Sequence, residues 1–461
     1  MVLTERQQKE LHRAIASYLK AYGFEKTCAS FAEECSEAAS CTDSDHGQLE
    51  TKWTSVLRLQ KKVLDLESKN KALTRELEEY ATGGINVHAK QSKWSKMLPV
   101  VPAWQTLSQH RGPINTVALH PTFNVCVSGS EDCSVRVWNL DSGVCEQVLT
   151  DHVASVEAVC FSPDGALLAT CSKDLYIKIW NTEGNQWRCT KTLQGHRHSV
   201  SSVCFVGGGS GGKPLRLLSA SRDETVKLWD PVIGYAVSTL EPHAGWVRWV
   251  SCSADSTLFA TAHNDYTVRV WQLETMKSLV VLRGHEHLVE CVEFAPLCTA
   301  RAIEGLLEED GEKAAEEGDA KSSSVSTSGR GREKESGSSS SLETAKEPSG
   351  AYLFSVSRDN TMRLWNINSG QCLQVFADHT NWVRRVTFHP GGLYAVTCSD
   401  DKDIRVWDVT SGRCVKTLRA SNQFVWCISS TLPHATSVQT ARKVLFVSGD
   451  VENVISVWQC R

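Results

Sequence analysis

Short runs in which apolar and polar residues alternate recur along the chain from about residue 100 onward. Val135-Arg-Val-Trp138 and Ile404-Arg-Val-Trp407 are two of these runs. Alternation with a period of two predicts half-buried β-strands, and the Gly, Asp, Asn and Ser residues between the runs predict turns. Seven units of this kind follow one another, and they end at Trp138, Trp180, Trp229, Trp271, Trp365, Trp407 and Trp458.

A histidine opens each of the first six units, and an aspartate lies six residues before each of their tryptophans. The histidines are His110, His152, His196, His243, His285 and His379, and the aspartates are Asp132, Asp174, Asp223, Asp265, Asp359 and Asp401. A period near 42 residues with an early His and a late Trp-Asp or Trp-Asn is typical of WD repeats. One four-stranded sheet cannot cover both of its faces, whereas radially stacked sheets cover one another. We therefore predict an all-β, seven-bladed WD-repeat β-propeller over residues 100–461.

The His, Ser and Asp of each unit are also the ingredients of a hydrolase triad. A catalytic triad occurs once in a chain, so six copies favour a structural role and predict that the protein is not an enzyme. We expect the Asp to accept from the His, the His to bond the Ser two residues before the Asp, and that Ser to reach the Trp indole. The residues of this expected blade network are His110, Asp132, Trp138, His152, Asp174, Trp180, His196, Asp223, Trp229, His379, Asp401 and Trp407, with Ser130, Ser172, Ser221, Ser357 and Ser399 as hydroxyl groups.

Two units depart from this pattern. The fourth has His263 at the Ser position. The seventh has Ser421 in place of the His and Glu452 in place of the Asp, so we expect its network to be broken and its blade to be the softest.

The way in which the ring closes also follows from the pattern. The seventh unit stops three residues after Trp458 and lacks the outer strand that follows the Trp of each complete unit. Residues 100–107 read as a strand that can supply it and so remove an open sheet edge. Units three, five and seven carry insertions between their first two strands, which places all three on one face of the propeller. The longest, residues 299–350, is acidic and Ser-rich, and we predict that it is disordered.

The opposite face, which carries the His and Asp connections, is the one that we expect to bind partners. Arg and Trp, the residue types enriched in interface hot spots, recur there beside the network residues. The expected partner-binding residues are Arg222, Trp246, Arg248, Arg358, Trp382 and Arg384. Guanidinium groups suit bidentate pairing with carboxylates. The alternative is that these Trp side chains belong to the core and that the Arg side chains are merely solvated.

Residues 1–38 predict a helical hairpin, and residues 48–81 predict a parallel two-stranded coiled coil. Thirty residues of hairpin cannot bury a core alone, which favours pairing with a second copy. The alternative is a hairpin and a single helix that pack on the propeller. Residues 82–99 are a polar, partly basic linker. The expected dimerisation residues are Leu11, Ile15, Tyr18, Leu19 and Phe31 in the hairpin and Val56, Leu59, Val63, Leu66, Asn70 and Leu73 in the coiled coil.

Composition narrows the function classes further. The net charge of −4 gives no reason to expect nucleic-acid binding. No long apolar run follows the polar N-terminus, so neither a signal peptide nor membrane insertion is expected. The 18 cysteines include no Cys-x-x-Cys pair, so we expect no metal and no cofactor, and we interpret the cysteines as small buried residues in a reducing cytoplasm.

The order of these parts resembles one family closely. A hairpin with Leu11-x3-Ile15-x2-Tyr18-Leu19 is similar to the LisH dimerisation motif, and a short coiled coil, a linker and seven WD repeats follow it. This combination resembles the lissencephaly-type nuclear distribution proteins over nearly the whole chain except residues 299–350.

The resemblance implies a homodimeric regulator of the cytoplasmic dynein motor that works with the dynein cofactors of the nuclear distribution pathway. It implies roles in nuclear migration, centrosome positioning and the mitotic spindle, and a cytoplasmic, microtubule-associated location. Arg222, Arg248 and Trp382 match the motor-contacting face of the family. In animals the family also supplies the non-catalytic subunit of a platelet-activating-factor acetylhydrolase, which adds acetylhydrolase catalytic subunits as expected partners. A propeller adaptor of a ubiquitin ligase or of a signalling complex is the alternative from another class.

Overall fold

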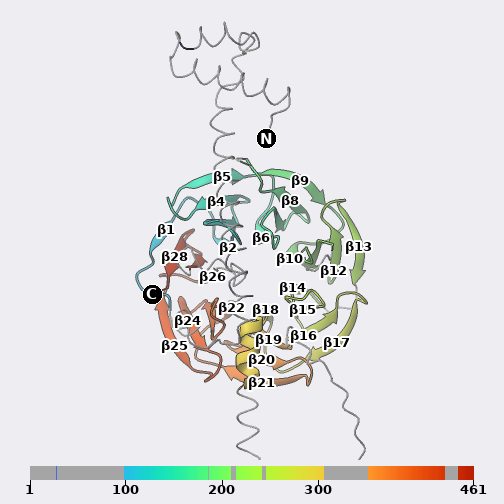
Figure 1. The fold of residues 1–461 in the computed structure, drawn as a ribbon, viewed down its shortest axis with the longest axis vertical. Helices are drawn as coiled ribbons and strands as arrows, with labels where there is room; N and C mark the ends of the chain where they lie inside the picture. The colour runs from blue at the N-terminus through green and yellow to red at the C-terminus, as the bar shows by residue number, and fades with distance from the viewer. Residues whose placement is uncertain are drawn as a thin grey trace, which may run out of the picture. The chain divides into compact units, whose positions relative to one another are not determined.

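Seven four-stranded antiparallel sheets stand side by side in a ring (Figure 1). A computed structural model describes Thr27 and residues 98–184, 186–208, 214–240, 245–305, 351–430 and 445–460. The predicted hairpin, the coiled coil with all its expected dimerisation residues, and the linker up to residue 97 lie outside these ranges, except for the helical Thr27. The seven-bladed propeller is confirmed.

The strands of each blade follow one another from the centre of the ring outward, except in the last blade. Blade one contains β2 (Ile114–Leu119), β3 (Val125–Ser130), β4 (Val135–Asn139) and β5 (Cys145–Leu149). Blade two contains β6 (Val156–Phe161), β7 (Leu167–Ser172), β8 (Ile177–Asn181) and β9 (Arg188–Leu193). Blade three contains β10 (Val200–Val206), β11 (Arg216–Ser221), β12 (Val226–Asp230) and β13 (Tyr235–Leu240). Blade four contains β14 (Val247–Cys252), β15 (Leu258–His263), β16 (Val268–Gln272) and β17 (Lys277–Leu282).

The remaining blades continue the series. Blade five contains β18 (Val289–Phe294), β19 (Tyr352–Ser357), β20 (Met362–Asn366) and β21 (Gln371–Phe376). Blade six contains β22 (Val383–Phe388), β23 (Tyr394–Ser399), β24 (Asp403–Asp408) and β25 (Cys414–Arg419). Blade seven contains β26 (Val425–Ser430), β27 (Leu445–Asp450), β28 (Ile455–Gln459) and β1 (Gln105–Leu107).

The outer strand of blade seven comes from the segment that precedes the first repeat. β1 pairs antiparallel with β28, and Gln105 lies opposite Val457. A separate bridge joins Pro99 to Cys460. The pairing agrees with the prediction for residues 100–107, although the regular strand begins only at Gln105. It joins the two ends of the propeller through hydrogen bonds, so the last sheet has no uncovered edge beside its tryptophan.

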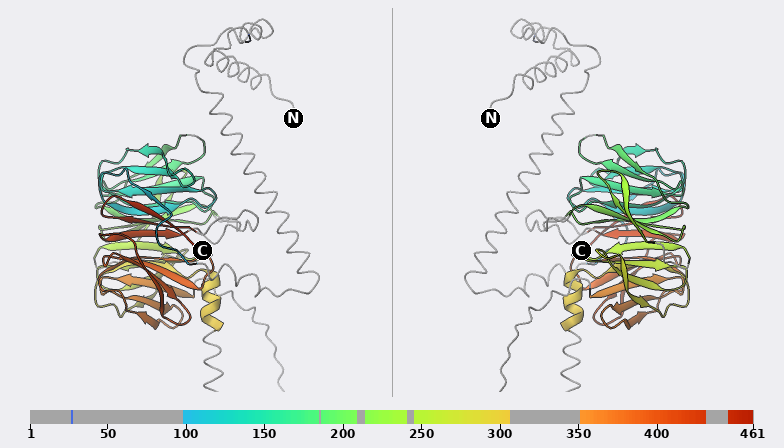
Figure 2. Two further views of the ribbon diagram at one scale, coloured as in Figure 1. Left: turned by 90° about the vertical axis from the view of Figure 1, so that its left-hand side faces the viewer. Right: turned by 90° about the vertical axis from the view of Figure 1, so that its right-hand side faces the viewer.

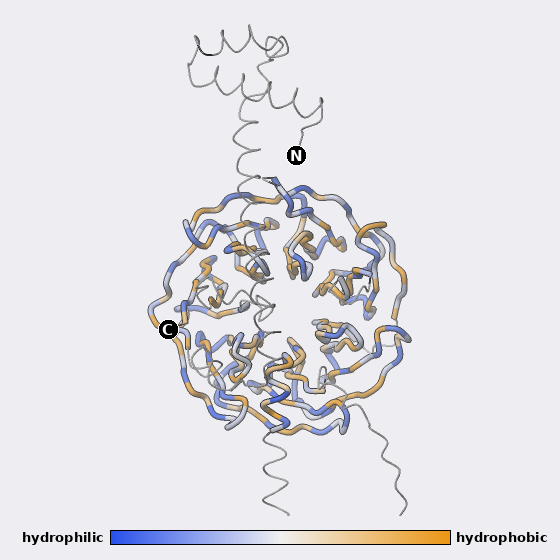
Figure 3. Tube along the Cα trace, in the orientation of Figure 1, coloured by the Kyte–Doolittle hydropathy of each residue, from blue (hydrophilic) through white to orange (hydrophobic). Residues whose placement is uncertain are grey.

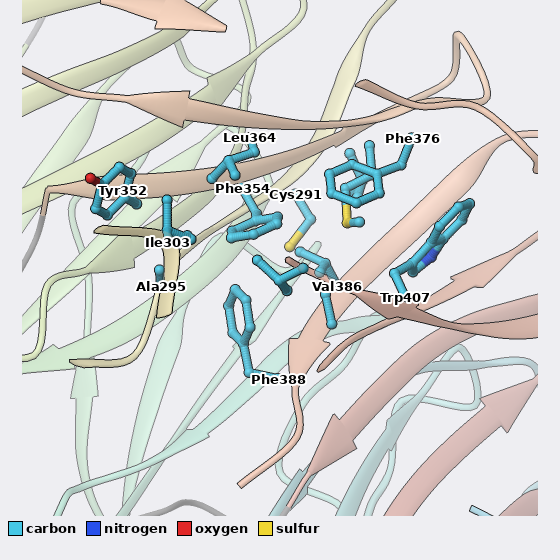
Figure 4. Packing of buried hydrophobic residues seen from close by; sticks show 14 of the residues in the cluster. Cys291, Ala295, Ile303, Tyr352, Phe354, Leu364, Phe376, Val386, Phe388 and Trp407 are labelled. Carbon is cyan, nitrogen blue, oxygen red and sulfur yellow. The ribbon is translucent and has the colours of Figure 1, made fainter. Parts of the chain in front are cut away.

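The core lies between neighbouring blades, because each sheet buries its faces against the next sheet. Apolar residues alternate with polar ones along the strands (Figure 3). Between blades five and six, Trp407 packs edge-on against Phe376, with 5.5 Å between the ring centroids, and Phe388 packs in the same way against Phe354 at 5.1 Å (Figure 4). Each blade therefore depends on its neighbour for burial, as the sequence pattern predicts.

The predicted disordered segment, residues 299–350, begins in ordered structure. Residues 297–305 form a helix on one face of the ring (Figure 2). Ala300 and Ile303 are buried in the cluster that contains Phe354 and Phe388. The prediction is therefore wrong for residues 299–305, because this stretch carries apolar side chains that reach the core of blades five and six. Residues 306–350 lie outside the described part of the chain.

Candidate partner-binding face

Each complete blade is locked by a chain of hydrogen bonds between an outer turn and the core. In blade three, His196 Nδ1 lies 2.8 Å from Asp223 Oδ2, and His196 Nε2 lies 2.7 Å from Ser219 Oγ. The Trp229 indole N–H donates to the same Ser219 Oγ over 2.8 Å. Blades one, two, five and six repeat this arrangement with His110–Asp132–Ser128–Trp138, His152–Asp174–Thr170–Trp180, His285–Asp359–Ser355–Trp365 and His379–Asp401–Thr397–Trp407.

The hydroxyl group of this network lies four residues before the Asp, not two as the sequence interpretation had it. In blade one, Ser128 lies opposite Arg136 in the register of β3 and β4, so the indole of Trp138 reaches back to Ser128. Ser130, the expected residue, lies at the end of β3 and donates to the carbonyl of Gly112 over 2.8 Å. Ser172, Ser221, Ser357 and Ser399 bond backbone carbonyls in the same way.

The carboxylate at the end of this chain is held in its charged form. Burial alone would raise the pKa of Asp223, but hydrogen bonds from His196, from Thr225 and from the backbone of Arg197 outweigh burial and lower it below its usual value. Asp132 and Asp359 follow the same pattern. An aspartate occupies this position in five blades, each with the same partners, so we interpret these carboxylates as structural groups.

The two divergent units keep part of the network. In blade four, Thr261 Oγ1 accepts from the Trp271 indole over 2.9 Å and lies 2.8 Å from His263 Nε2, while Asp265 pairs with Arg269. His243 lies outside the described residues.

In blade seven, Ser448 accepts from the Trp458 indole over 2.9 Å, and Ser421 donates to Asp450 over 2.7 Å. We expected the network of blade seven to be broken, and this is wrong for the hydrogen bond between the Trp458 indole and the Ser448 hydroxyl, which is kept. Asp450, two residues before Glu452, takes over the carboxylate's role.

The face that carries the His and Asp connections surrounds a cavity of about 230 Å³ at the centre of the ring. We call this face the mouth face. Each blade contributes to the cavity the residue five positions after its opening His, or after Ser421 in blade seven. These residues are Asn115, Glu157, Ser201, Arg248, Glu290, Arg384 and Trp426. The innermost strands β2, β6, β10, β14, β18, β22 and β26 surround this centre in Figure 1 and carry these residues at their beginnings.

Charge is distributed unevenly around the cavity. Glu131 and Glu157 lie on blades one and two, whereas Arg222, Arg248, Arg358 and Arg384 lie on blades three to six. Lys173 lies 3.6 Å from Glu131 and 3.4 Å from Glu157. The basic side of the cavity is the one that contains the expected partner-binding arginines.

Three of these arginines share one carboxylate. Arg248 donates through Nη1 to both oxygens of Glu290 at 3.1 and 3.2 Å, Arg358 Nε pairs with Glu290 Oε1, and Arg384 Nη1 lies 3.5 Å from it. Arg384 also binds Asp400 through two hydrogen bonds of 2.9 and 2.7 Å. Burial would raise the pKa of Glu290, but the charges of Arg248, Arg384 and Arg358 outweigh burial and lower it, so the carboxylate is ionised.

The two expected tryptophans lie at the rim, each beside an arginine of the preceding blade. Arg222 stacks 5.1 Å above the ring of Trp246, and Arg358 stacks 4.2 Å above the ring of Trp382. Trp246 is 39% exposed, so it is a surface residue. The arginines are less exposed than the sequence suggested: the side chains of Arg248, Arg358 and Arg384 are 17–19% accessible, because they turn toward Glu290.

Glu290 is the residue of this face that sequence reasoning missed. A signal was present, because Arg248 and Arg384 both lie five residues after the His that opens their unit. The same position in unit five is Glu290. In the sequence, Glu290 is a single acidic residue between hydrophobic neighbours. Nothing in that stretch indicates that arginines from three other parts of the chain will pair with it.

Two further properties concern only the described part of the chain. Its His, Cys, Asp and Glu side chains do not gather in any group of three that could hold a metal ion. None of its helices has the length and apolar character needed to cross a lipid bilayer.

The ring of seven sheets and the repeated His–Asp–hydroxyl–Trp network define a WD-repeat β-propeller. Comparison with known families agrees: the chain matches the WD domain, G-beta repeat, over residues 103–139, 143–181, 187–230, 234–272, 342–366 and 370–408. It matches the PAC1 LisH domain over residues 5–38.

Relatives among characterised proteins identify the family. The nuclear distribution protein PAC1 of Coccidioides posadasii is 35% identical over 396 residues, which cover 84% of this chain and 77% of the relative. PAC1 of Gibberella zeae is 38% identical over 403 residues, with 84% and 79% covered, and nudF of Aspergillus niger is 34% identical over 395 residues, with 84% and 80% covered. The chain belongs to the PAC1/nudF family of nuclear distribution proteins, and it is a non-catalytic WD-repeat protein.

Proposed function

We propose that this protein is a homodimeric regulator of cytoplasmic dynein that binds the motor domain through the mouth face. The binding residues would be Arg222, Trp246, Arg248, Arg358, Trp382 and Arg384. In this role the protein works in the cytoplasm on microtubules, together with the dynein cofactors of the nuclear distribution pathway. It supports nuclear migration, centrosome positioning and spindle function.

The observation that carries this proposal is the clustering of arginine and tryptophan on one face of a protein of the nuclear distribution family. Arg222, Arg248, Arg358 and Arg384 come from four consecutive blades and line the same side of one cavity. Trp246 and Trp382 flank them under stacked guanidinium groups. Arginine and tryptophan dominate the energetics of protein interfaces, and guanidinium groups select carboxylates. The chemistry of this face therefore favours an acidic surface of a protein partner.

Insertions support the choice of this face. The connections between β10 and β11, between β18 and β19 and between β26 and β27 are the long ones, and all three lie at the ends of the strands opposite to the His and Asp turns. The mouth face keeps short connections in every blade. A face that must contact a large partner has to remain uncovered, which fits this distribution.

Dimerisation would place two mouth faces on one regulator. The LisH match over residues 5–38 supports pairing, and the coiled-coil pattern over residues 48–81 extends it. Once one propeller has bound, the second faces the motor at a raised effective concentration. Moderate affinity of each mouth face is then sufficient.

The binding face is tested with the double variant Arg222→Ala with Trp382→Ala. We expect its affinity for purified dynein motor domain to fall by about 30-fold or more, since two hot-spot side chains are truncated. Arg413→Ala is the control, because Arg413 is exposed in the turn after β24, on the opposite face. Unchanged motor affinity of the double variant in a folded dimer would show that the motor binds elsewhere.

The pairing segment is tested separately by deleting residues 1–81. Multi-angle light scattering should then give the mass of one chain in place of two. Dimers that persist after the deletion would contradict the assignment of Leu11, Ile15, Val56 and Leu59 to the dimer interface.

A further inference from the structure

Glu290 has an unusual position on the mouth face, because it is an acidic residue at the centre of the basic side. It lies on β18 of blade five, next to the cavity, and it is 8% exposed. Arg248 reaches it from blade four, Arg358 from its own blade and Arg384 from blade six. One carboxylate thus connects three neighbouring blades.

The geometry leaves little freedom to these three arginines. Both oxygens of Glu290 accept hydrogen bonds from Arg248, and Glu290 lies at the register shift between Val289 and Cys291 in the pairing of β18 with β19. Asp400 holds the remaining side of Arg384, and the indole of Trp382 covers the guanidinium of Arg358. A free arginine side chain loses rotamer entropy on binding, and here that loss has already occurred.

Charge explains why the carboxylate is needed. Three guanidinium groups and the carboxylates of Glu290 and Asp400 carry a net charge of +1 (three positive and two negative). Without Glu290 the same groups would carry +2, with three like charges around a site of low exposure. Mutual repulsion would then turn the guanidinium groups toward solvent.

We infer that Glu290 is a positioning residue of the partner-binding face: it aims Arg248, Arg358 and Arg384 at the partner while being too buried to be the main contact itself. This inference rests on the proposed function of the mouth face. It means that recognition of an acidic partner depends on an acidic residue. It also means that the three arginines act as one unit, so their single substitutions should not add.

The first experiment measures the positions of the arginines without any partner. Wild-type and Glu290→Gln proteins are labelled with phenylglyoxal, and the modified arginines are quantified by peptide mass spectrometry. We expect labelling of Arg248, Arg358 and Arg384 to rise several-fold in the variant, while labelling of Arg222, which is paired with Glu157, stays constant. Equal labelling of the three arginines in both proteins would overturn the inference.

The second experiment measures binding of the full-length dimer to purified dynein motor domain. Glu290→Gln should lower the affinity by about tenfold, although it makes the face more positive. Glu293→Gln is the matched control: it removes a carboxylate three residues along the same strand that does not line the cavity, and it should leave motor affinity unchanged. Unchanged or tighter motor binding by Glu290→Gln would show that Glu290 only reduces the charge of the face.

Failure of the inference and failure of the proposed function give different results. If the Arg222→Ala with Trp382→Ala variant binds the motor normally, the mouth face is not the motor site, and the labelling result still decides whether Glu290 positions the arginines. If that variant loses binding but Glu290→Gln does not, only the role of Glu290 is refuted. Thermal melting is recorded for every variant, and Glu290→Asp, which keeps the charge on a shorter side chain, replaces Glu290→Gln if the latter does not fold. For Glu290→Asp we expect a smaller rise in arginine labelling and a smaller loss of motor affinity than for Glu290→Gln. Labelling and affinity equal to those of the wild type would again overturn the inference.

Discussion

The blade network can be tested by removing one hydroxyl group at constant side-chain volume. Thr397 in blade six is suited to this, because Thr397→Val replaces only the hydroxyl by a methyl group. Thr397 Oγ1 lies 2.7 Å from His379 Nε2 and accepts from the Trp407 indole over 2.8 Å. With His379 Nδ1 bonded to Asp401, the protons of this chain point from indole to hydroxyl, from hydroxyl to imidazole and from imidazole to carboxylate.

The magnitude follows from the burial of the two groups that lose their partner. Trp407 is 1% exposed and His379 is 4% exposed, so water cannot replace the missing hydroxyl. A buried polar group without a partner costs about 1–3 kcal/mol, and the variant creates two of them. We therefore expect the free energy of unfolding to fall by about 4 kcal/mol.

Urea-induced unfolding of the full chain, followed by tryptophan fluorescence, measures this change. Thr417→Val is the matched control, since Thr417 is exposed on the outer strand of the same blade and should shift the free energy of unfolding by at most about 0.5 kcal/mol. If Thr397→Val destabilised the protein no more than Thr417→Val, the hydrogen-bond chain would not lock the blade.

Three further predictions concern acid stability, a buried carboxyl group and the helix after β18. Hydrogen bonds hold the pKa of Asp223 below its usual value, so the stability that this carboxylate contributes is present above pH ~4 and is lost as the pH falls. Asp223→Asn should accordingly flatten the fall in melting temperature between pH 5 and pH 3, and a slope equal to that of the wild type would contradict this. Burial raises the pKa of Glu293 to about 7, above its unfolded-state value, so stability is greatest at low pH and declines as the pH rises toward 7. Glu293→Gln should thus stabilise the protein at pH 8 by up to about 3 kcal/mol, and by less because Glu293 is only partly buried on β18, whereas the two proteins should melt alike at pH 4.5. Ile303→Ala should lower the free energy of unfolding in urea by about 3 kcal/mol, because Ile303 is 4% exposed. Replacement of residues 307–349 by a short linker should leave the midpoint of urea unfolding unchanged.

Repeated local patterns explain why so much of the fold is visible in the chain itself. Alternation along strands such as Ile404-Arg-Val-Trp407 is a property of consecutive residues, and the burial of these strands confirms it. The strand pattern of residues 100–107 predicted a segment that can cover the edge of the last sheet, and β1 does so. Both inferences need only the period of the repeat and the rule that sheet edges are covered.

Other features required positions that sequence spacing does not contain. Ser128 and Ser130 are two residues apart on one strand, so both side chains point to the same side, and only the register with β4 selects Ser128 as the partner of Trp138. The helix at residues 297–305 was hidden within a long acidic insertion, because average composition over some fifty residues outweighs a short apolar stretch.

By itself, then, the sequence determined the number of blades, the closure of the ring, the His, Asp and Trp of each network, and the face on which arginine and tryptophan gather. These depend on periodicity, which every repeat records again. The tertiary structure decided which hydroxyl completes each network and which groups neutralise one another at the mouth. Arg248, Glu290 and Arg384 lie on three different blades, far apart in the chain, and only the radial packing of the sheets brings their charges within hydrogen-bonding distance.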